Sequence, residues 1–218
     1  MNHVMATNQS ALIDDSASQR EGFKLRGRLG AVVLVPVVAA TLLSRPLVRE
    51  GSWTDVALSV FGWVALGTAF FLRLWAMLYI GGKKSRTLVA EGPYALCRHP
   101  LYLASFFILL ALVLFLKSLS LMLAVVLVAA IYLLWLLPSE ERHLIDCFGE
   151  QYRKYCRRTP RIWPRLSAVQ RPGMREVKMA SFIGEYSRCF GCMMIAAMTQ
   201  VIGHLRILPW WPAWLPFS

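Results

Sequence analysis

The chain has 218 residues, of which 57% are hydrophobic and 17% are charged, and its formal net charge is +12 at neutral pH. A soluble domain of this length needs fewer apolar residues, so the composition excludes an ordinary soluble domain and indicates one compact unit dissolved in lipid. The positive charge lies beside apolar stretches, which favours anionic lipid headgroups as partners and argues against nucleic acid.

The first 80 residues divide into a polar tail and two apolar stretches. Residues 1–28 lack the short apolar core and cleavage site of a signal peptide, so we expect a polar cytoplasmic tail. Residues 29–48 and 53–80 are each long enough to cross the hydrocarbon core as a helix, which takes about 20 apolar residues. The segment 29–80 is therefore predicted to form two transmembrane helices. Arg73 lies inside the second, where it either snorkels to the headgroups or belongs to a site.

The segment 81–166 starts with a polar loop and continues into a predicted transmembrane hairpin. Two nearly unbroken apolar runs, 101–116 and 119–137, are separated only by Lys117 and Ser118. A two-residue connection between runs of this length predicts two antiparallel helices whose outer ends return to the same membrane surface.

A cytosolic amphipathic helix is predicted directly after the hairpin. Ser139 is a natural N-cap for this helix, and acids in a first turn interact favourably with the helix dipole. Apolar and aromatic side chains then recur at spacings of four, four and three residues, which gives the helix one face to bury. These side chains are Leu144, Phe148, Tyr152 and Tyr155.

The segment 167–218 is a C-terminal extension that contains a fifth candidate span, residues 190–208. The polar side chains of Gln200, His204 and Arg206 leave three alternatives open for this stretch. It crosses the membrane, lies along the interface, or docks on the bundle.

Cys189 and Cys192 form a lone CxxC pair just before the fifth apolar stretch. This spacing occurs in zinc and redox sites, but no second ligand pair accompanies it. We expect the two cysteines to pack in the bundle and expect no metal site in the protein.

The orientation of the chain follows from Lys and Arg in its short loops, because basic residues resist translocation. Residues 1–28 hold four of them, residues 81–98 hold four and residues 139–178 hold ten, whereas the opposite loops hold only Arg45, Arg49 and Lys117. We therefore predict an all-α, polytopic bundle of four or five spans in the cell membrane, with its N-terminus and large loops in the cytoplasm.

Residues 91–102 form a first polar cluster at the expected cytoplasmic mouth of the spans. Pro100 suits the first position of the hairpin's first helix, so free backbone N–H groups are expected beside Arg98 and His99. A helix N-terminus with neighbouring cations is an anion site. The alternative, equally compatible with position, is that Arg98 snorkels to headgroups and His99 caps a turn.

Glu140 and Glu141 form a second polar cluster, at the end of the hairpin's second helix. Because the hairpin is tight at its far side, both clusters are expected at one mouth. Cations and anions gathered there suit a zwitterionic ligand.

The order of these parts resembles the isoprenylcysteine carboxyl methyltransferase and phospholipid methyltransferase family. The resemblance covers about residues 85–165. Its parts are Gly92-Pro93-Tyr94, Arg98-His99-Pro100-Leu101-Tyr102, the hairpin, Glu140-Glu141, and Phe148-Gly149 followed by Tyr152, Tyr155 and Pro160.

The resemblance implies a membrane enzyme that binds S-adenosylmethionine from the cytosol and methylates a lipophilic acceptor from the bilayer, such as a protein-S-isoprenylcysteine-like carboxylate. Arg98 would bind the cofactor's carboxylate and the glutamates its ammonium, while aromatic rings suit the adenine and the sulfonium. Arg98 and Glu141 are the candidate catalytic residues. The family's cofactor-binding residues map onto Tyr94, Arg98, His99, Pro100, Tyr102, Glu140 and Glu141.

Two positions depart from the family pattern. Leu136 stands where members that act on prenylated cysteine commonly carry an arginine, which weakens the expectation of a carboxylate substrate. Ala104 stands where glycine is frequent, but it is small and keeps close helix packing. His143 is expected to face solvent.

Two other functions compete with methyl transfer. Membrane sterol and steroid reductases, which use NADPH, are similar in a region like Tyr155, Arg161 and Pro164, although paired acids repel a nicotinamide phosphate group. The other alternative is a non-catalytic membrane scaffold with a vestigial site. Oligomeric state is not written in the sequence.

Overall fold

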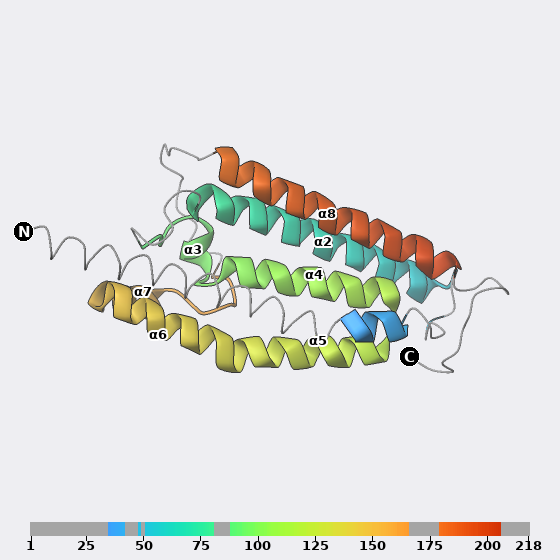
Figure 1. Cartoon of the computed structure of the whole chain (residues 1–218), viewed down its shortest axis with the longest axis horizontal. Coiled ribbons are helices and arrows are strands. Elements are labelled where there is room, and N and C mark those ends of the chain that lie inside the picture. Colours follow the sequence, from blue (N-terminus) through green and yellow to red (C-terminus); the bar gives the residue numbers. More distant parts are fainter. Residues whose placement is uncertain (1–34, 42–47, 49–50, 81–87, 166–178, 206–218) are drawn as a thin grey trace, which may run out of the picture.

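Helices make up all the regular structure of the described residues, which are 35–41, 48, 51–80, 88–165 and 179–205 of a computed structural model (Figure 1). Residues 35–41 are helical, whereas residues 29–34 and 42–47 of the predicted first span and the whole of the predicted tail lie outside the described residues. The remaining helices are α2 (Trp53–Ile80), α3 (Pro93–Leu96), α4 (Pro100–Leu116), α5 (Leu119–Ile131), the π turn η1 (Tyr132–Leu136), α6 (Leu137–Phe148), α7 (Glu150–Arg158) and α8 (Met179–Leu205).

The bundle is centred on α4, which packs against α2, against α8 and against its hairpin partner α5 (Figure 1). Small residues permit the close approach of α2 and α4. At Gly62, for example, an added Cβ would lie 2.5 Å from the ring of Phe115. Ala104 is fully buried, which confirms the close packing expected there. The core between α2, α4 and α8 is formed by Ala65, Leu66, Ala111, Phe115 and Ala196.

Among the residues that the structure describes, two helices are long and apolar enough to cross a membrane, namely α2 and the continuous helix Leu119–Phe148. Pro100–Leu116 and Cys189–Gly203 are shorter apolar helices. Large apolar side chains such as Phe61 and Val126 point outward, which suits a surrounding of lipid. These features are those of a membrane protein, while the predicted number of four or five spans is not established.

The predicted pair of helices joined at Lys117 and Ser118 is confirmed, while its passage through a membrane stays a prediction. Lys117 ends α4 in the left-handed conformation, with φ of 50°, and its N–H donates to the Val113 carbonyl. Ser118 then caps α5, where its side-chain oxygen accepts a hydrogen bond from the backbone N–H of Leu121. The ammonium of Lys117 also pairs with the carboxylate of Asp55 at the start of α2. The turn therefore connects the C-terminal end of α4 with the N-terminal ends of α5 and α2.

The prediction that Ser139 caps a separate cytosolic helix is wrong. The helix runs on from α5 through η1 into α6, and the Ser139 hydroxyl donates to the Leu136 carbonyl at 2.8 Å. Pro138 has no N–H, and in a regular α-helix its ring would clash with the carbonyl four residues earlier. The π turn directly before it widens the helix and accommodates the proline. The helix breaks instead at Gly149, whose φ of 55° and ψ of −130° suit glycine.

The C-terminal apolar stretch forms a helix that begins earlier than predicted. It starts at Met179, before Cys189, and docks along α2 and α4. Residues 190–205 therefore dock on the bundle, whereas passage of this stretch through the membrane stays a prediction, and residues 206–208 lie outside the described residues. Cys189 is buried and Cys192 is partly buried.

Candidate active site

The carboxylate of Glu141 is the centre of a buried polar cluster. One of its oxygens, Oε1, accepts hydrogen bonds from Arg98 Nη1 at 2.7 Å, from His99 Nε2 at 3.3 Å and from Arg161 Nε at 3.1 Å. The other oxygen, Oε2, accepts from Arg161 Nη2 at 2.5 Å. The two polar clusters of the sequence therefore meet at one mouth, as predicted. Arg98 binds Glu141 with its side chain only 16% exposed, so it does not snorkel to headgroups.

Backbone hydrogen bonds hold the segment after α7 against the turn that precedes α4. The N–H of Arg98 donates to the Pro160 carbonyl at 2.9 Å, and the N–H of His99 donates to the Arg161 carbonyl at 3.3 Å. The Arg98 side chain also donates through Nε to the Thr159 carbonyl at 2.8 Å. This pairing brings the guanidinium of Arg161 over Glu141.

Tyr102 and Glu140 form a second contact beside the first. The Tyr102 hydroxyl donates to Glu140 Oε2 at 2.7 Å. The Tyr102 ring lies edge-on between two further rings, with centroid distances of 5.7 Å to His99 and 6.1 Å to Tyr132. The rings of His99, Tyr102 and Tyr132 therefore form an aromatic wall beside the carboxylates of α6.

Tyr94, in α3, is buried and packs with Ala76 and Tyr79 of α2. Its carbonyl accepts a hydrogen bond from the Tyr155 hydroxyl at 2.6 Å, which ties α3 to α7. Its own hydroxyl is buried and has no hydrogen-bond partner among the described residues. Burial raises the pKa of the Tyr94 phenol above its usual range, so the group stays protonated. Gly92, with φ of 62°, permits this turn because an added Cβ would lie 2.3 Å from the Tyr79 ring.

Burial and neighbouring charges set the protonation states near Glu141. Burial lowers the pKa of His99, so its imidazole is neutral near pH 7 and its Nε2–H donates to the carboxylate. Burial also raises the pKa of the Cys97 thiol to about 11, which keeps it uncharged. For Glu141, in the polar extension beyond the apolar part of its helix, burial opposes ionisation, but hydrogen bonding and charge from the two arginines outweigh it and lower the pKa.

The predicted site residues fall into three groups. The structure brings five of them together at the mouth, namely Arg98, His99, Tyr102, Glu140 and Glu141. Pro100 is the first residue of α4, as expected, and positions the residues before it. Tyr94 is buried in α3 beside Tyr79.

Three further residues that the sequence pointed to are Arg161, Arg73 and His143. Arg161, which the sequence indicated only through the reductase alternative, is a member of the cluster. Arg73 contacts the hydroxyl of Ser105 at 3.3 Å. His143 is exposed on α6, as expected, with its Nε2 3.6 Å from the Cys147 sulfur.

The mouth contains two guanidiniums, on Arg98 and Arg161, and two carboxylates, on Glu140 and Glu141. Arg98 and Arg161 share Glu141, while Glu140 is held by a neutral hydroxyl. The arginines can bind the carboxylate of a zwitterionic ligand, and a glutamate can bind its ammonium. Each charged group then still faces an opposite charge. The aromatic wall adds faces for a planar ring or a cationic methyl group.

Comparisons with known proteins identify a family and two relatives. The family model described as phospholipid methyltransferase matches residues 52–151, which include both glutamates and end before Arg161. No solved structure matches the chain.

Two named relatives cover most of the chain. The cobalt-zinc-cadmium resistance protein CzcN of Cupriavidus metallidurans is 36% identical over 163 residues, which cover 74% of this chain and 75% of that protein. The nickel-cobalt-cadmium resistance protein NccN of Alcaligenes xylosoxydans xylosoxydans is 31% identical over 196 residues, which cover 88% of this chain and 92% of that protein.

Proposed function

Because the chain belongs to the phospholipid methyltransferase family, we propose that it transfers a methyl group from S-adenosylmethionine to a lipophilic acceptor at the cytoplasmic face of the membrane. The observation that carries this proposal is the cluster of Arg98, His99 and Arg161 around Glu141, with Tyr102 on Glu140. The basic loops on the same side support the cytoplasmic orientation.

The residues at the mouth fit the chemistry of this cofactor. Arg98 and Arg161 would hold its carboxylate, and Glu140 would hold its ammonium. The rings of Tyr102 and Tyr132 would lie against its adenine or its sulfonium. The buried hydroxyl of Tyr94 adds a polar atom that has no partner among the described side chains, and a ligand with a donor or an acceptor would satisfy it.

The chemistry demands little acid or base from the protein. When bound, S-adenosylmethionine would supply a methyl group activated by its sulfonium: an electron pair on the acceptor bonds to the methyl carbon, the C–S bond breaks to leave a thioether, and the proton of an amine or hydroxyl acceptor passes to water. The chain's own residues orient the reactants and exclude water. Buried His99 and Cys97 are uncharged near neutral pH, so neither leaves an additional charge beside the reacting groups.

The acceptor we propose is a lipid that carries an amine or hydroxyl nucleophile. Leu136 lies in the π turn at the end of the apolar run, and its apolar side chain offers no partner for a carboxylate. This supports a neutral nucleophile over a prenylcysteine carboxylate.

The first test is calorimetric binding of S-adenosylmethionine to the detergent-purified full chain. We expect saturable binding that Glu140→Gln weakens at least about tenfold, because a charged hydrogen bond to the ammonium is lost. Glu150→Gln, which removes an exposed acid in the first turn of α7, is the matched control and is expected to bind like the native chain. Absence of binding, or binding of NADPH instead, would contradict the proposal.

The second test follows the methyl group itself. The native chain and Glu140→Gln are incubated with methyl-labelled S-adenosylmethionine and a bacterial lipid extract, and in parallel with a prenylated cysteine. We expect label in the lipid fraction with the native chain only. Label in the prenylated cysteine alone would overturn the proposed acceptor class while leaving methyl transfer intact.

The relatives' names suggest the cellular setting of this activity. Both are named for resistance to metals that include cobalt and cadmium. We propose that methylation of a membrane lipid by this chain contributes to such resistance. A metal-sensitive host that expresses the native chain should then grow in more cobalt or cadmium than one that expresses Glu140→Gln. Equal growth would exclude a catalytic contribution.

A further inference from the structure

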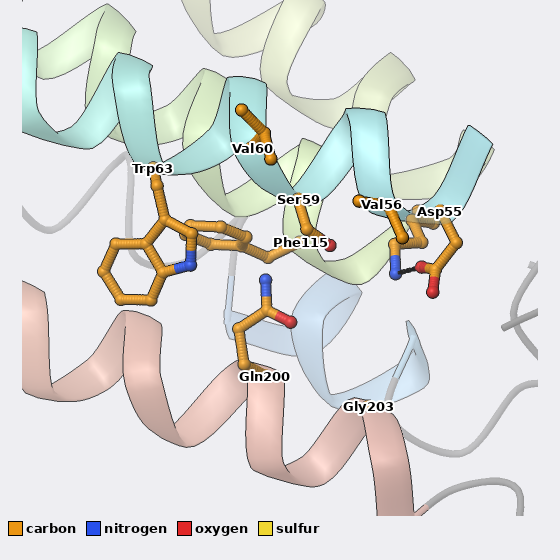
Figure 2. Close-up of a pocket in the computed structure, with 9 residues that line it drawn as sticks. Asp55, Val56, Ser59, Val60, Trp63, Phe115, Gln200 and Gly203 are labelled. Atoms are coloured by element: carbon orange, nitrogen blue, oxygen red, sulfur yellow. Dashed lines mark hydrogen bonds and ion pairs between the residues drawn. The ribbon is translucent and has the colours of Figure 1, made fainter. Parts of the chain in front are cut away.

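A cavity of about 260 Å³ lies between α2, α4 and α8 at the hairpin end of the bundle (Figure 2). It adjoins Lys117, which follows the last residue of α4, whereas Arg98 and His99 precede the first. The 17 residues of α4 span about 25 Å at the rise of an α-helix, so this cavity is separate from the candidate active site.

The side chain of Gln200 gives the cavity a hydrogen-bond donor. It extends from α8 and directs its amide nitrogen toward α2, near Ser59 and Trp63 (Figure 2). This nitrogen is buried and has no hydrogen-bond partner within the part of the chain that the structure describes. A buried donor without an acceptor is unfavourable, so a ligand that carries an acceptor oxygen would be stabilised here.

The charges that line the cavity balance each other. The carboxylate of Asp55 pairs with the ammonium of Lys117, and the two side chains are 11% and 8% exposed. Asp55 also accepts a hydrogen bond from the N–H of Gly51 at 3.0 Å. A charged ligand would have to break this pair or remain uncompensated, so the lining favours a neutral polar head.

One wall of the cavity continues onto the outer surface of α2. Val56, Val60 and Trp63 line it and are also 49%, 55% and 42% exposed. They belong to a helix that is long and apolar enough to cross a membrane. An apolar chain attached to the head can therefore lie along α2 among the lipid tails.

We propose that this cavity binds the head of a neutral ester lipid. An ester carbonyl oxygen of the head accepts a hydrogen bond from Gln200 Nε2, and the acyl chain lies on Val56 and Val60. The site is independent of methyl transfer, since none of its residues belongs to the mouth.

The test is binding of 1-monooleoylglycerol to the detergent-purified full chain, measured by thermal unfolding over a titration. Sodium oleate keeps the chain but has a charged head, and monoacetin keeps the ester head without the long chain. We expect 1-monooleoylglycerol alone to raise the unfolding temperature. Gln200→Leu, which removes the donor at similar size, should weaken the apparent affinity about tenfold, the factor of one hydrogen bond. Gln151→Leu, on the exposed surface of α7, should bind like the native chain.

A second variant, Ser59→Phe, fills the cavity and is expected to abolish the response to 1-monooleoylglycerol while the protein still unfolds cooperatively. If this variant does not fold, the comparison between Gln200→Leu and Gln151→Leu decides. A response to 1-monooleoylglycerol that is equal in all variants would overturn the proposal, because it would report a general detergent effect. A response to oleate or monoacetin as large as that to 1-monooleoylglycerol would overturn the neutral head or the lipid chain, respectively.

Discussion

The two ends of α4 each have a buried ionic contact, but the contacts differ in how many partners share the charge. At the C-terminal end, Asp55 and Lys117 form a pair of one acid and one base. At the N-terminal end, Glu141 receives hydrogen bonds from Arg98, His99 and Arg161, which come from two segments distant in sequence.

This difference separates a structural contact from a binding site. Removing one member of a buried ion pair takes an opposite charge away from the other member, which lowers stability. A carboxylate shared by two arginines can release one of them to a ligand and stay paired with the other. The hairpin pair is therefore expected to affect stability without changing cofactor binding, whereas the mouth is expected to affect stability and cofactor binding together.

Glu141→Ala tests the mouth and has the largest expected effect. It removes the acceptor of two guanidiniums, one of which, on Arg98, is only 16% exposed, so we expect a loss of about 3 kcal/mol of unfolding free energy. We also expect binding of S-adenosylmethionine to fall at least about a hundredfold, because the arginines lose their fixed orientation. Denaturant unfolding and calorimetry on the detergent-purified chain measure the two effects.

The control for this variant is Glu150→Ala, which removes an exposed acid from α7. We expect it to change the unfolding free energy by less than about 0.5 kcal/mol. If Glu141→Ala kept native affinity for the cofactor, the ion cluster would be structural and the proposed site would be misplaced.

Lys117→Met tests the hairpin end. It leaves the Asp55 carboxylate without its ammonium partner, and we expect a loss of about 2 kcal/mol of stability with cofactor affinity unchanged. Adding Asp55→Asn removes the uncompensated charge but keeps an acceptor for the Gly51 N–H, so the double variant should recover most of the loss. A double-mutant cycle measures the coupling. A parallel loss of cofactor affinity would show that the two ends are not independent.

Gly92→Ala tests the turn that precedes Tyr94 at the start of α3. The backbone φ of 62° disfavours alanine, and the new Cβ would lie 2.3 Å from the Tyr79 ring, so we expect a loss of about 2 kcal/mol. Thermal unfolding measures it. Gly67→Ala is the matched control, since nothing lies within 4 Å of the Cβ added there and alanine favours the helix by about 1 kcal/mol. Equal effects in both variants would contradict the strain at Gly92.

The sequence predicted the parts of this architecture that depend on local pattern. The apolar runs on either side of Lys117 and Ser118 define the hairpin, and a tight hairpin brings its outer ends to one side, so the meeting of Arg98 with Glu141 followed from topology. The continuous helix through Pro138 was missed because a proline ordinarily ends a helix, and only the π turn before it permits continuation.

Arg161 was missed as a site residue for a different reason. It follows Glu141 by 20 positions along the chain, beyond the helix break at Gly149 and the end of α7. Its place depends on backbone hydrogen bonds between two irregular segments, one of them from the His99 N–H, and such pairing leaves no periodic signal. An arginine shortly before a proline, after a run of buried tyrosines, was the available hint.

Tyr102→Phe is the mildest test of the difference between the two ends. It removes one hydroxyl, which donates to Glu140 at 2.7 Å, and keeps the ring that faces His99 and Tyr132. Because a single hydrogen bond contributes about 1 kcal/mol, we expect S-adenosylmethionine to bind about fivefold more weakly by calorimetry. The unfolding temperature should change little, since water can replace the hydroxyl at this partly exposed contact. Tyr186→Phe, at an exposed position on α8, controls for the loss of a phenol. If Tyr102→Phe bound the cofactor like that control, Glu140 would not need orientation by Tyr102, and the ammonium would have to be held elsewhere at the mouth.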